Sequence, residues 1–231
     1  MTRSEELAHN LAQIRESIAA AASSAGRSGD SVRLMAVSKT HPWEEILALS
    51  GAGQLLFGEN RVQEGEAKLA PKGQRPMRVN LIGHLQSNKV GKALSLFDRI
   101  DSVDSLRLAT RIDRLSAERY PILLELNTSG EAAKHGFESE DELFSALDQI
   151  VLLPNIRVEG LMTLGPLGGS EGAIRSSFGH LRCVFERARE RFDLPAFTEL
   201  SMGMSGDFPL AIAEGSTCVR IGTALFGKRG Q

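Results

Sequence analysis

The sequence predicts a single (β/α)8 barrel of the TIM type, preceded by one extra helix, and three observations favour this fold. Eight short apolar runs are spaced along the chain, helical patterns lie between them, and no linker rich in Pro, Gly or Ser interrupts the alternation. Repeated strand–helix units are typical of a parallel sheet covered by helices. Because 231 residues suit one such barrel, we expect residues 1–231 to form a single domain.

Several of the predicted strands are near-continuous in Val, Ile, Leu, Met and Ala. Strands that are buried on both faces, as in a parallel sheet, have this composition, whereas half-exposed strands alternate apolar and polar residues. The predicted strands are residues 32–38, 55–58, 78–83, 99–103, 122–127, 157–163, 197–202 and 218–226.

The predicted helices carry apolar residues at helical spacing with charged residues between them. The clearest is segment 174–192, in which the recurring apolar residues are Phe178, Leu181, Phe185, Ala188 and Phe192. The others are 5–22, 43–52, 86–97, 105–117, 140–152 and 208–214. A doubly wound open sheet is the alternative fold, and the lack of a G-x-G-x-x-G motif after the first strand argues against it.

Composition and charge exclude several classes of protein. The net charge is −2, with one Trp, one Tyr and no basic run, so we expect no nucleic-acid binding. No apolar stretch approaches the roughly 20 residues that a membrane span needs, and no apolar signal region follows the first residues, so we expect no membrane association and a cytoplasmic location. The only cysteines, Cys183 and Cys218, are far apart, which predicts neither a disulfide framework nor a metal site. With no obvious apolar stripe, a monomer is expected.

A barrel carries its chemistry at the carboxyl ends of its strands, and Lys39 ends the first predicted strand. Burial in an apolar barrel mouth would lower the pKa of this lysine and leave more neutral amine to attack a carbonyl group. The alternative, which position alone favours, is a lysine whose ammonium extends from the strand end into solvent. His41 and Lys134 are further candidates, as a proton shuttle and as a contact for an anionic ligand, although solvated side chains are the simpler interpretation of both.

The ends of the last two predicted strands favour a phosphate site, as in many barrels. Gly203 and Gly222 permit close approach of the backbone, while Ser201, Ser205 and Thr223 supply hydroxyl donors. Glycine is ordinary at barrel turns, so either segment alone is weak evidence. Together, opposite a lysine on the first strand, the two segments are more specific.

Five segments in order make the chain resemble the pyridoxal-phosphate homeostasis proteins. They are AVSKT (36–40), FGENRVQE (57–64), IGHLQSNK (82–89), LSMGMSGD (200–207) and VRIGTALFG (219–227). The resemblance spans nearly the whole chain, from about residue 4 to residue 227. It implies a barrel related to the N-terminal domain of alanine racemase, with pyridoxal 5′-phosphate (PLP) as cofactor.

The resemblance also implies roles for single residues. Lys39 would form the Schiff base with PLP, and Arg220 would face the pyridine nitrogen. Ser201, Gly203, Gly222 and Thr223 would surround the phosphate, while Asn60 and His84 would line the pocket near the ring. Because arginine stays charged, it disfavours a protonated pyridine nitrogen and makes the ring a weaker electron sink.

Family members are associated with the supply and buffering of PLP and with amino- and keto-acid balance, without established turnover, so the resemblance implies a carrier, not an enzyme. PLP-requiring apo-enzymes are candidate recipients. The alternative is a PLP enzyme with weak racemase or lyase activity. However, the one tyrosine that could act as a second acid or base, Tyr120, lies on the amino-terminal side of the fifth predicted strand and so at the wrong end of the barrel. A Schiff-base aldolase acting on a sugar phosphate is a third interpretation, which requires Lys39 and the phosphate site but no cofactor.

Overall fold

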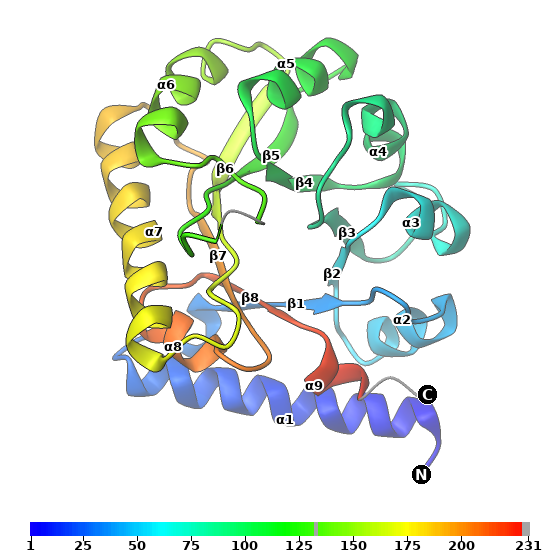
Figure 1. The fold of residues 1–231 in the computed structure, drawn as a ribbon. Helices are drawn as coiled ribbons and strands as arrows, with labels where there is room; N and C mark the ends of the chain where they lie inside the picture. Colours follow the sequence, from blue (N-terminus) through cyan, green and yellow to red (C-terminus); the bar gives the residue numbers. More distant parts are fainter. Residues whose placement is uncertain (132–133, 228–231) are drawn as a thin grey trace.

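The computed structural model describes residues 1–131 and 134–227; residues 132–133, in the loop that carries Lys134, and residues 228–231 lie outside the described chain. In the described part, eight parallel strands close into a barrel in which each strand pairs with its neighbours in sequence and β8 pairs with β1 (Figure 1). The strands are β1 (Arg33–Val37), β2 (Leu56–Glu59), β3 (Arg78–Leu81), β4 (Arg99–Val103), β5 (Tyr120–Glu125), β6 (Ile156–Met162), β7 (Glu199–Met204) and β8 (Cys218–Ile221). The predicted barrel is therefore confirmed, and the open sheet was the wrong alternative.

Helices surround the barrel and follow the strands in order. They are α1 (Arg3–Ser24), α2 (Trp43–Gly51), α3 (Val62–Lys68), α4 (Val90–Leu96), α5 (Leu106–Leu115), α6 (Glu140–Ile150), α7 (Glu171–Arg191), α8 (Phe208–Ala213) and α9 (Thr223–Phe226), with short 3₁₀ turns η1 (Gly29–Ser31) and η2 (Ser87–Lys89). No helix of the described chain is both long and apolar enough to span a membrane.

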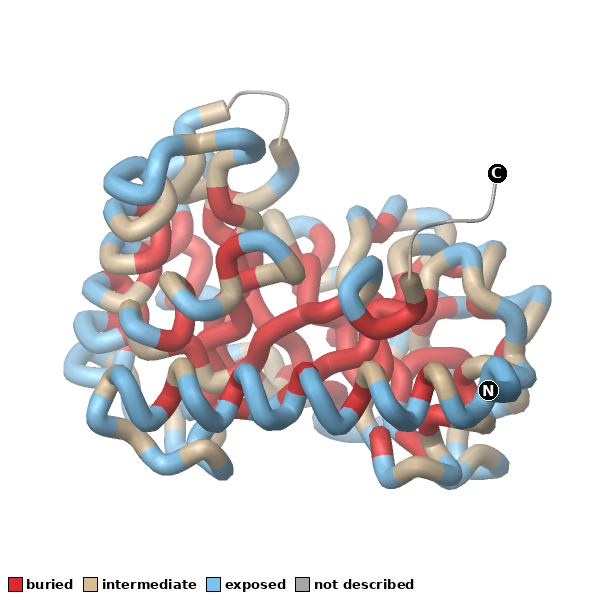
Figure 2. Tube along the Cα trace, turned by 90° about the horizontal axis from the view of Figure 1, so that it is seen from below, coloured by how far each residue is buried: buried red, intermediate tan, exposed pale blue. Residues whose placement is uncertain are grey.

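The predicted extra helix is α1, which packs along α2, α8 and α9 at the point where the ring of helices closes (Figure 1). Its apolar face, which includes Leu7, Leu11 and Ile14, is buried, while its other face is exposed along its length (Figure 2). Thr2 and Glu5 form a capping box that satisfies backbone donors at its first turn. Helix α1 thus covers the part of the barrel that the single-turn α9 is too short to cover.

The largest differences between prediction and structure concern β8 and α3. Strand β8 ends at Ile221 rather than at residue 226, because Gly222 caps the helix α9. Periodicity cannot separate a short apolar strand from a short buried helix, so the run was predicted as one strand. Helix α3 was not predicted, because its sequence, VQEGEAK, holds a glycine and little apolar periodicity.

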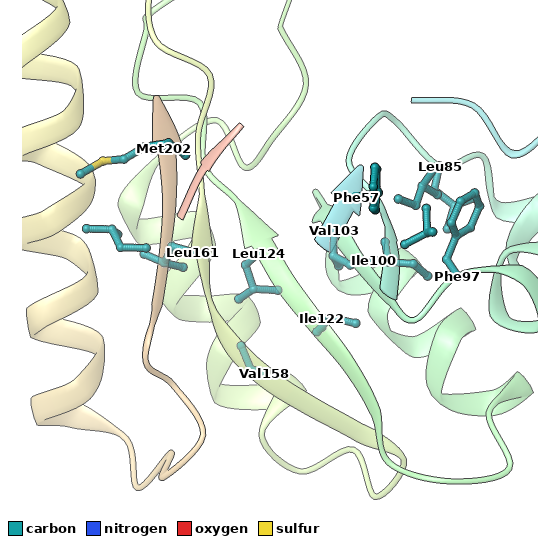
Figure 3. Close-up of a cluster of buried hydrophobic side chains, with 14 of the residues drawn as sticks. Phe57, Leu85, Phe97, Ile100, Val103, Ile122, Leu124, Val158, Leu161 and Met202 are labelled. Atoms are coloured by element: carbon teal, nitrogen blue, oxygen red, sulfur yellow. The ribbon is translucent and has the colours of Figure 1, made fainter. Parts of the chain in front are cut away.

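The core consists mainly of an apolar layer between the strands and the surrounding helices. Figure 3 shows part of this layer, with Phe57, Phe97, Ile100, Leu124 and Met202 among its buried side chains. Such close-packed burial is the main source of stability in a domain of this size.

Inside the barrel, the amino-terminal end is filled by charged side chains. Arg99 at the start of β4 bonds to Asp101 (Nε to Oδ1, 2.6 Å) and to Glu199 at the start of β7 (Nη2 to Oε1, 2.7 Å). All three side chains are buried. Arg33 and Glu159 extend this network toward the surface. The opposite, carboxyl end is therefore the place to look for a functional site.

Candidate functional site

A cavity of about 600 Å³ lies at the carboxyl end of the barrel. It is lined by seven of the residues predicted from the sequence: Lys39, Asn60, His84, Ser205, Arg220, Gly222 and Thr223. Glu125, His41, Lys134 and His135 also face it, together with apolar side chains such as Val37 and Ile82. The volume is within the range of small-molecule and cofactor sites.

Lys39 lies two residues beyond the end of β1, half-buried at the wall of the cavity. Its ammonium forms no hydrogen bond or ion pair with any residue of the described chain, so the group is available to a ligand. The next residue, Thr40, has a φ of 68°. A β-branched residue rarely adopts this left-handed conformation, which costs about 1–3 kcal/mol and often marks a functional site.

An ion cluster under the Lys39 loop holds this strained backbone in place. The Lys68 ammonium, at the end of α3, donates to the carbonyl oxygens of Ser38 (2.7 Å) and His41 (3.0 Å). It also pairs with Glu59 Oε1 (2.8 Å) and Glu64 Oε1 (3.0 Å). The backbone N–H of Thr40 donates to Glu64. We call Glu59, Glu64 and Lys68 the loop clamp.

Burial changes the pKa of one residue of the loop clamp, Glu59. Glu59 is fully buried, and this burial raises its pKa, although the nearby Lys68 partly offsets the effect. One oxygen of Glu59, Oε1, accepts from Ser38 Oγ (2.5 Å) and faces Lys68, while the other, Oε2, has no partner in the described chain. Glu64 and Lys68 were not predicted as site residues, because α3 was not predicted; the FGENRVQE segment beside the lysine loop is the sequence signal for them.

Arg220 forms the floor of the cavity and is almost completely buried. It donates to Ser201 Oγ (2.8 Å) and to the carbonyl oxygen of Thr163 (2.7 Å). Burial lowers the pKa of this guanidinium from its very high ordinary value, and the group stays charged at neutral pH. Two hydrogen bonds thus fix a positive charge at the base of the cavity.

Two predicted phosphate residues, Ser201 and Gly203, do not line the cavity. Ser201 is buried behind it, where its hydroxyl accepts from Arg220. Gly203 has a φ of 97°, and a Cβ there would lie 2.6 Å from Cβ of Ala211, so its role in this structure is to let β7 turn tightly onto α8. The neighbouring Ser205, with Gly222 and Thr223 across from it, does face the cavity.

Two histidines flank the mouth of the cavity. His84 Nδ1 bonds to Asp104 Oδ2 (3.1 Å), and its ring stacks on that of His135 with centroids 4.0 Å apart. One nitrogen or oxygen atom from each of Asp104, His84 and His135 lies within 4.8 Å of the others, a spacing that a metal ion could also bridge. The hydrogen bond and the ring stack account for this proximity. His41 bonds to Glu45 (2.9 Å) and stacks on Phe226, which ties it to the helix start rather than to a proton path.

Two further groups matter for the chemistry of the cavity. Lys134 lines it but is paired with Glu131 (2.7 Å) and the carbonyl oxygen of Gly165 (2.7 Å). Glu125, the last residue of β5, is buried, and burial raises its pKa to about 7. Glu125 was not predicted as a site residue, because the sequence of an apolar strand that ends in a glutamate does not show whether this glutamate lines the barrel interior.

Comparison with known proteins identifies first the class of protein. The family model for the alanine racemase N-terminal domain matches residues 4–230. Solved alanine racemases share the fold: that of Clostridium difficile 630 has a TM-score of 0.76 at 15% identity, over 98% of this chain and 57% of that one. The chain is therefore a barrel of the alanine racemase N-terminal type.

More similar relatives define the family. The chain is 42% identical to the pyridoxal phosphate homeostasis protein of Escherichia coli K12 over 97% of both chains. It is 43% identical to that of Synechocystis PCC 6803, over 86% of this chain and 92% of the relative. The structure of PipY from Synechococcus elongatus with PLP bound has a TM-score of 0.82 at 37% identity, over 96% of this chain and 100% of that one. The chain belongs to the pyridoxal phosphate homeostasis proteins, as the five motifs predicted.

Proposed function

We propose that this protein holds PLP as a Schiff base on Lys39 and serves in the intracellular supply and buffering of PLP, and so in amino- and keto-acid balance. The observation that carries the proposal is that Lys39 lines the cavity and that its amine has no partner in the described chain. In the proposed reaction the neutral amine adds to the PLP aldehyde and one water leaves. Bound PLP would supply a conjugated imine and a visible absorbance.

The donors around the cavity fit an anionic, phosphorylated ligand. Ser205, Gly222 and Thr223 line the cavity on the side of β7 and β8, and we infer that their hydroxyl and backbone groups hold the phosphate. We assign Ser201 and Gly203 to the same site as supports, one through Arg220 and the other through the β7 turn. Arg220 would meet the pyridine nitrogen, with Asn60 and His84 near the ring.

A carrier role is favoured over an enzyme. The relatives' names specify homeostasis and not a reaction. Tyr120 donates to the carbonyl oxygen of Phe97 (2.7 Å) at the amino end of β5, far from Lys39, so it is unsuited as the second acid or base of a racemase. We also propose a cytoplasmic location, a monomer, and PLP-requiring apo-enzymes as recipients.

The absorbance spectrum of the purified protein with added PLP tests the proposal. The expected result is an imine band that borohydride reduction abolishes by converting the imine to a stable amine adduct. This adduct should map to the peptide that contains Lys39. A protein that takes up no PLP would contradict it and favour the cofactor-free aldolase. Steady consumption of an amino acid by the PLP-loaded protein would instead support the weak racemase or lyase.

The loop clamp yields a prediction about Lys39. In a Lys68→Met variant the carbonyls of Ser38 and His41 lose their donor, and the strained Thr40 is free to relax. We expect PLP affinity to fall about tenfold, which corresponds to about 1.4 kcal/mol of the strain that the clamp no longer holds. The imine band at saturating PLP should persist, because Lys39 itself is intact.

Lys92→Met on α4 is the matched control for this variant. Lys92 makes an exposed ion pair with Glu66 (2.6 Å), and such pairs contribute about 0–1 kcal/mol. Titration of both variants with PLP, together with urea unfolding of each, separates affinity from stability. Equal PLP affinity in the two variants would show that the clamp does not position Lys39.

A further inference from the structure

Glu125 is a buried carboxyl that the proposed cofactor contacts leave unexplained. It ends β5, the strand halfway around the closed barrel from β1 and Lys39. Its exposed fraction is 4%, and it lines the cavity together with Arg220. A charged group in such a place usually has a partner, because burying an unpaired carboxylate is unfavourable.

No such partner exists within the described residues, where the Glu125 side chain makes no hydrogen bond and no ion pair. The other buried carboxyls of the described chain differ in this respect, since each accepts at least one hydrogen bond; they are Glu59, Asp101, Asp113, Glu199 and Asp207. A buried polar group that faces a cavity without a protein partner is placed to meet a ligand.

The charges around Glu125 set its protonation. Burial is the main cause that raises its pKa to about 7; Arg220 on β8 lowers it in part, and Asp104 beyond β4 raises it. Strand β6 places the uncharged Met162 beside it. The remaining titratable groups around the cavity are Lys39 and His41 after β1, His84 after β3, and Lys134 and His135 after β5. Glu125 therefore changes charge near neutral pH.

We propose that Glu125 contacts bound PLP as a neutral carboxylic acid, which donates a hydrogen bond to an oxygen of the cofactor, and that its ionisation weakens PLP binding. This inference rests on the proposed function. PLP carries a phosphate and a ring oxygen that is readily ionised, so an added carboxylate in the same cavity would repel it. A neutral acid instead offers a donor to a cofactor that is rich in acceptors.

The sign of the pH dependence follows from linkage. An anionic ligand raises the pKa of Glu125 in the complex above the value of about 7 in the empty protein. Binding of PLP then takes up a proton. The Glu125 contribution to affinity is complete below the pKa of the empty protein, and it is lost as pH rises from there toward the pKa of the complex, by at most about tenfold per pH unit.

The test compares wild type with Glu125→Gln, a variant of nearly the same shape that keeps a donor and does not titrate. PLP dissociation constants are measured for both proteins from about pH 6 to about pH 8.5, the range in which Glu125 ionises. The imine on Lys39 has its own pH dependence, which the two proteins share, so the ratio of their constants reports Glu125 alone. We expect a ratio near one at the acid end, and several-fold tighter binding by Glu125→Gln at the alkaline end.

Calorimetry gives a second readout that does not depend on absolute affinity. Titrations in two buffers of different ionisation enthalpy should show more proton uptake on PLP binding by wild type than by Glu125→Gln near neutral pH. A ratio that stays constant with pH would overturn the inference. The inference would also be overturned if Glu125→Gln bound PLP more weakly than wild type and the difference grew as pH rises. In that case the wild-type carboxylate would be accepting a hydrogen bond from a cationic group of PLP. If neither protein binds PLP, the proposed function itself fails.

Discussion

A Lys39→Ala variant is expected to lose the PLP imine band completely while remaining folded. Lys39 lies beyond the end of β1 at the cavity wall, and its side chain makes no contact that the fold requires, since it has no hydrogen bond or ion pair in the described chain. Removing it takes away the amine that attacks the aldehyde, and the other lysine at the cavity, Lys134, is engaged with Glu131 and Gly165. Absorbance and borohydride reduction, compared with wild type, measure the loss.

The second lysine at the cavity makes the matched control. Lys134 is held by Glu131 and by the carbonyl oxygen of Gly165, so its amine is not free to reach the aldehyde. Lys134→Met should therefore keep the imine band. A band that survives in Lys39→Ala and disappears in Lys134→Met would transfer the Schiff base to Lys134 and contradict the assignment made here.

An Arg99→Met variant is expected to lose about 3–5 kcal/mol of unfolding free energy, because removing one partner of a buried ion cluster leaves uncompensated charge. Arg99 is the cation between Asp101 and Glu199, and all three side chains are buried. Burial raises the pKa of Glu199, but the hydrogen bonds and charge of Arg99 outweigh this and hold the pKa below its ordinary value. For Asp101, burial prevails and the pKa is raised even beside Arg99.

The sign of the pH effect follows from Glu199. In wild type its lowered pKa contributes stability that is present above the unfolded value near 4.5 and is lost as pH falls through the folded pKa. Without Arg99 the same burial would raise that pKa, so the folded variant would bind the proton more readily than the unfolded chain. The deficit of Arg99→Met should thus be largest near neutral pH and should shrink under acid conditions.

Urea unfolding from neutral to acid pH measures the loss of unfolding free energy in Arg99→Met, and Arg157→Met is the control variant. Arg157 also contacts the network, through Glu159 (2.8 Å), but its side chain is 42% exposed, so its loss should cost no more than about 1 kcal/mol. Comparable destabilisation by the two variants would show that burial does not govern this network. Saturated PLP loading should be unchanged in Arg99→Met, because the network occupies the amino end of the barrel, away from the cavity.

The barrel, its eight strands and the end at which its chemistry lies could all be predicted from the amino-acid sequence. Apolar runs such as the one before Lys39 predict buried parallel strands, because both faces of each strand must be covered. Their carboxyl ends must then meet at one end of the barrel, so Lys39, Asn60, His84 and Arg220 could be expected to converge. They do line one cavity.

Only the tertiary structure decided which of the predicted side chains reach that cavity and what charge its walls carry. Ser201 and Gly203 share a strand with Met204, which lines the cavity, yet neither of them lines it: the Ser201 hydroxyl lies behind Arg220, to which it is bonded, and Gly203 packs tightly against α8. The loop clamp depends on α3, a helix whose apolar residues are too few and too irregularly spaced to be predicted from the sequence. The protonation of Glu125 depends on its burial beside Arg220 and Asp104, and burial and charge proximity are properties of the folded chain that no local pattern contains.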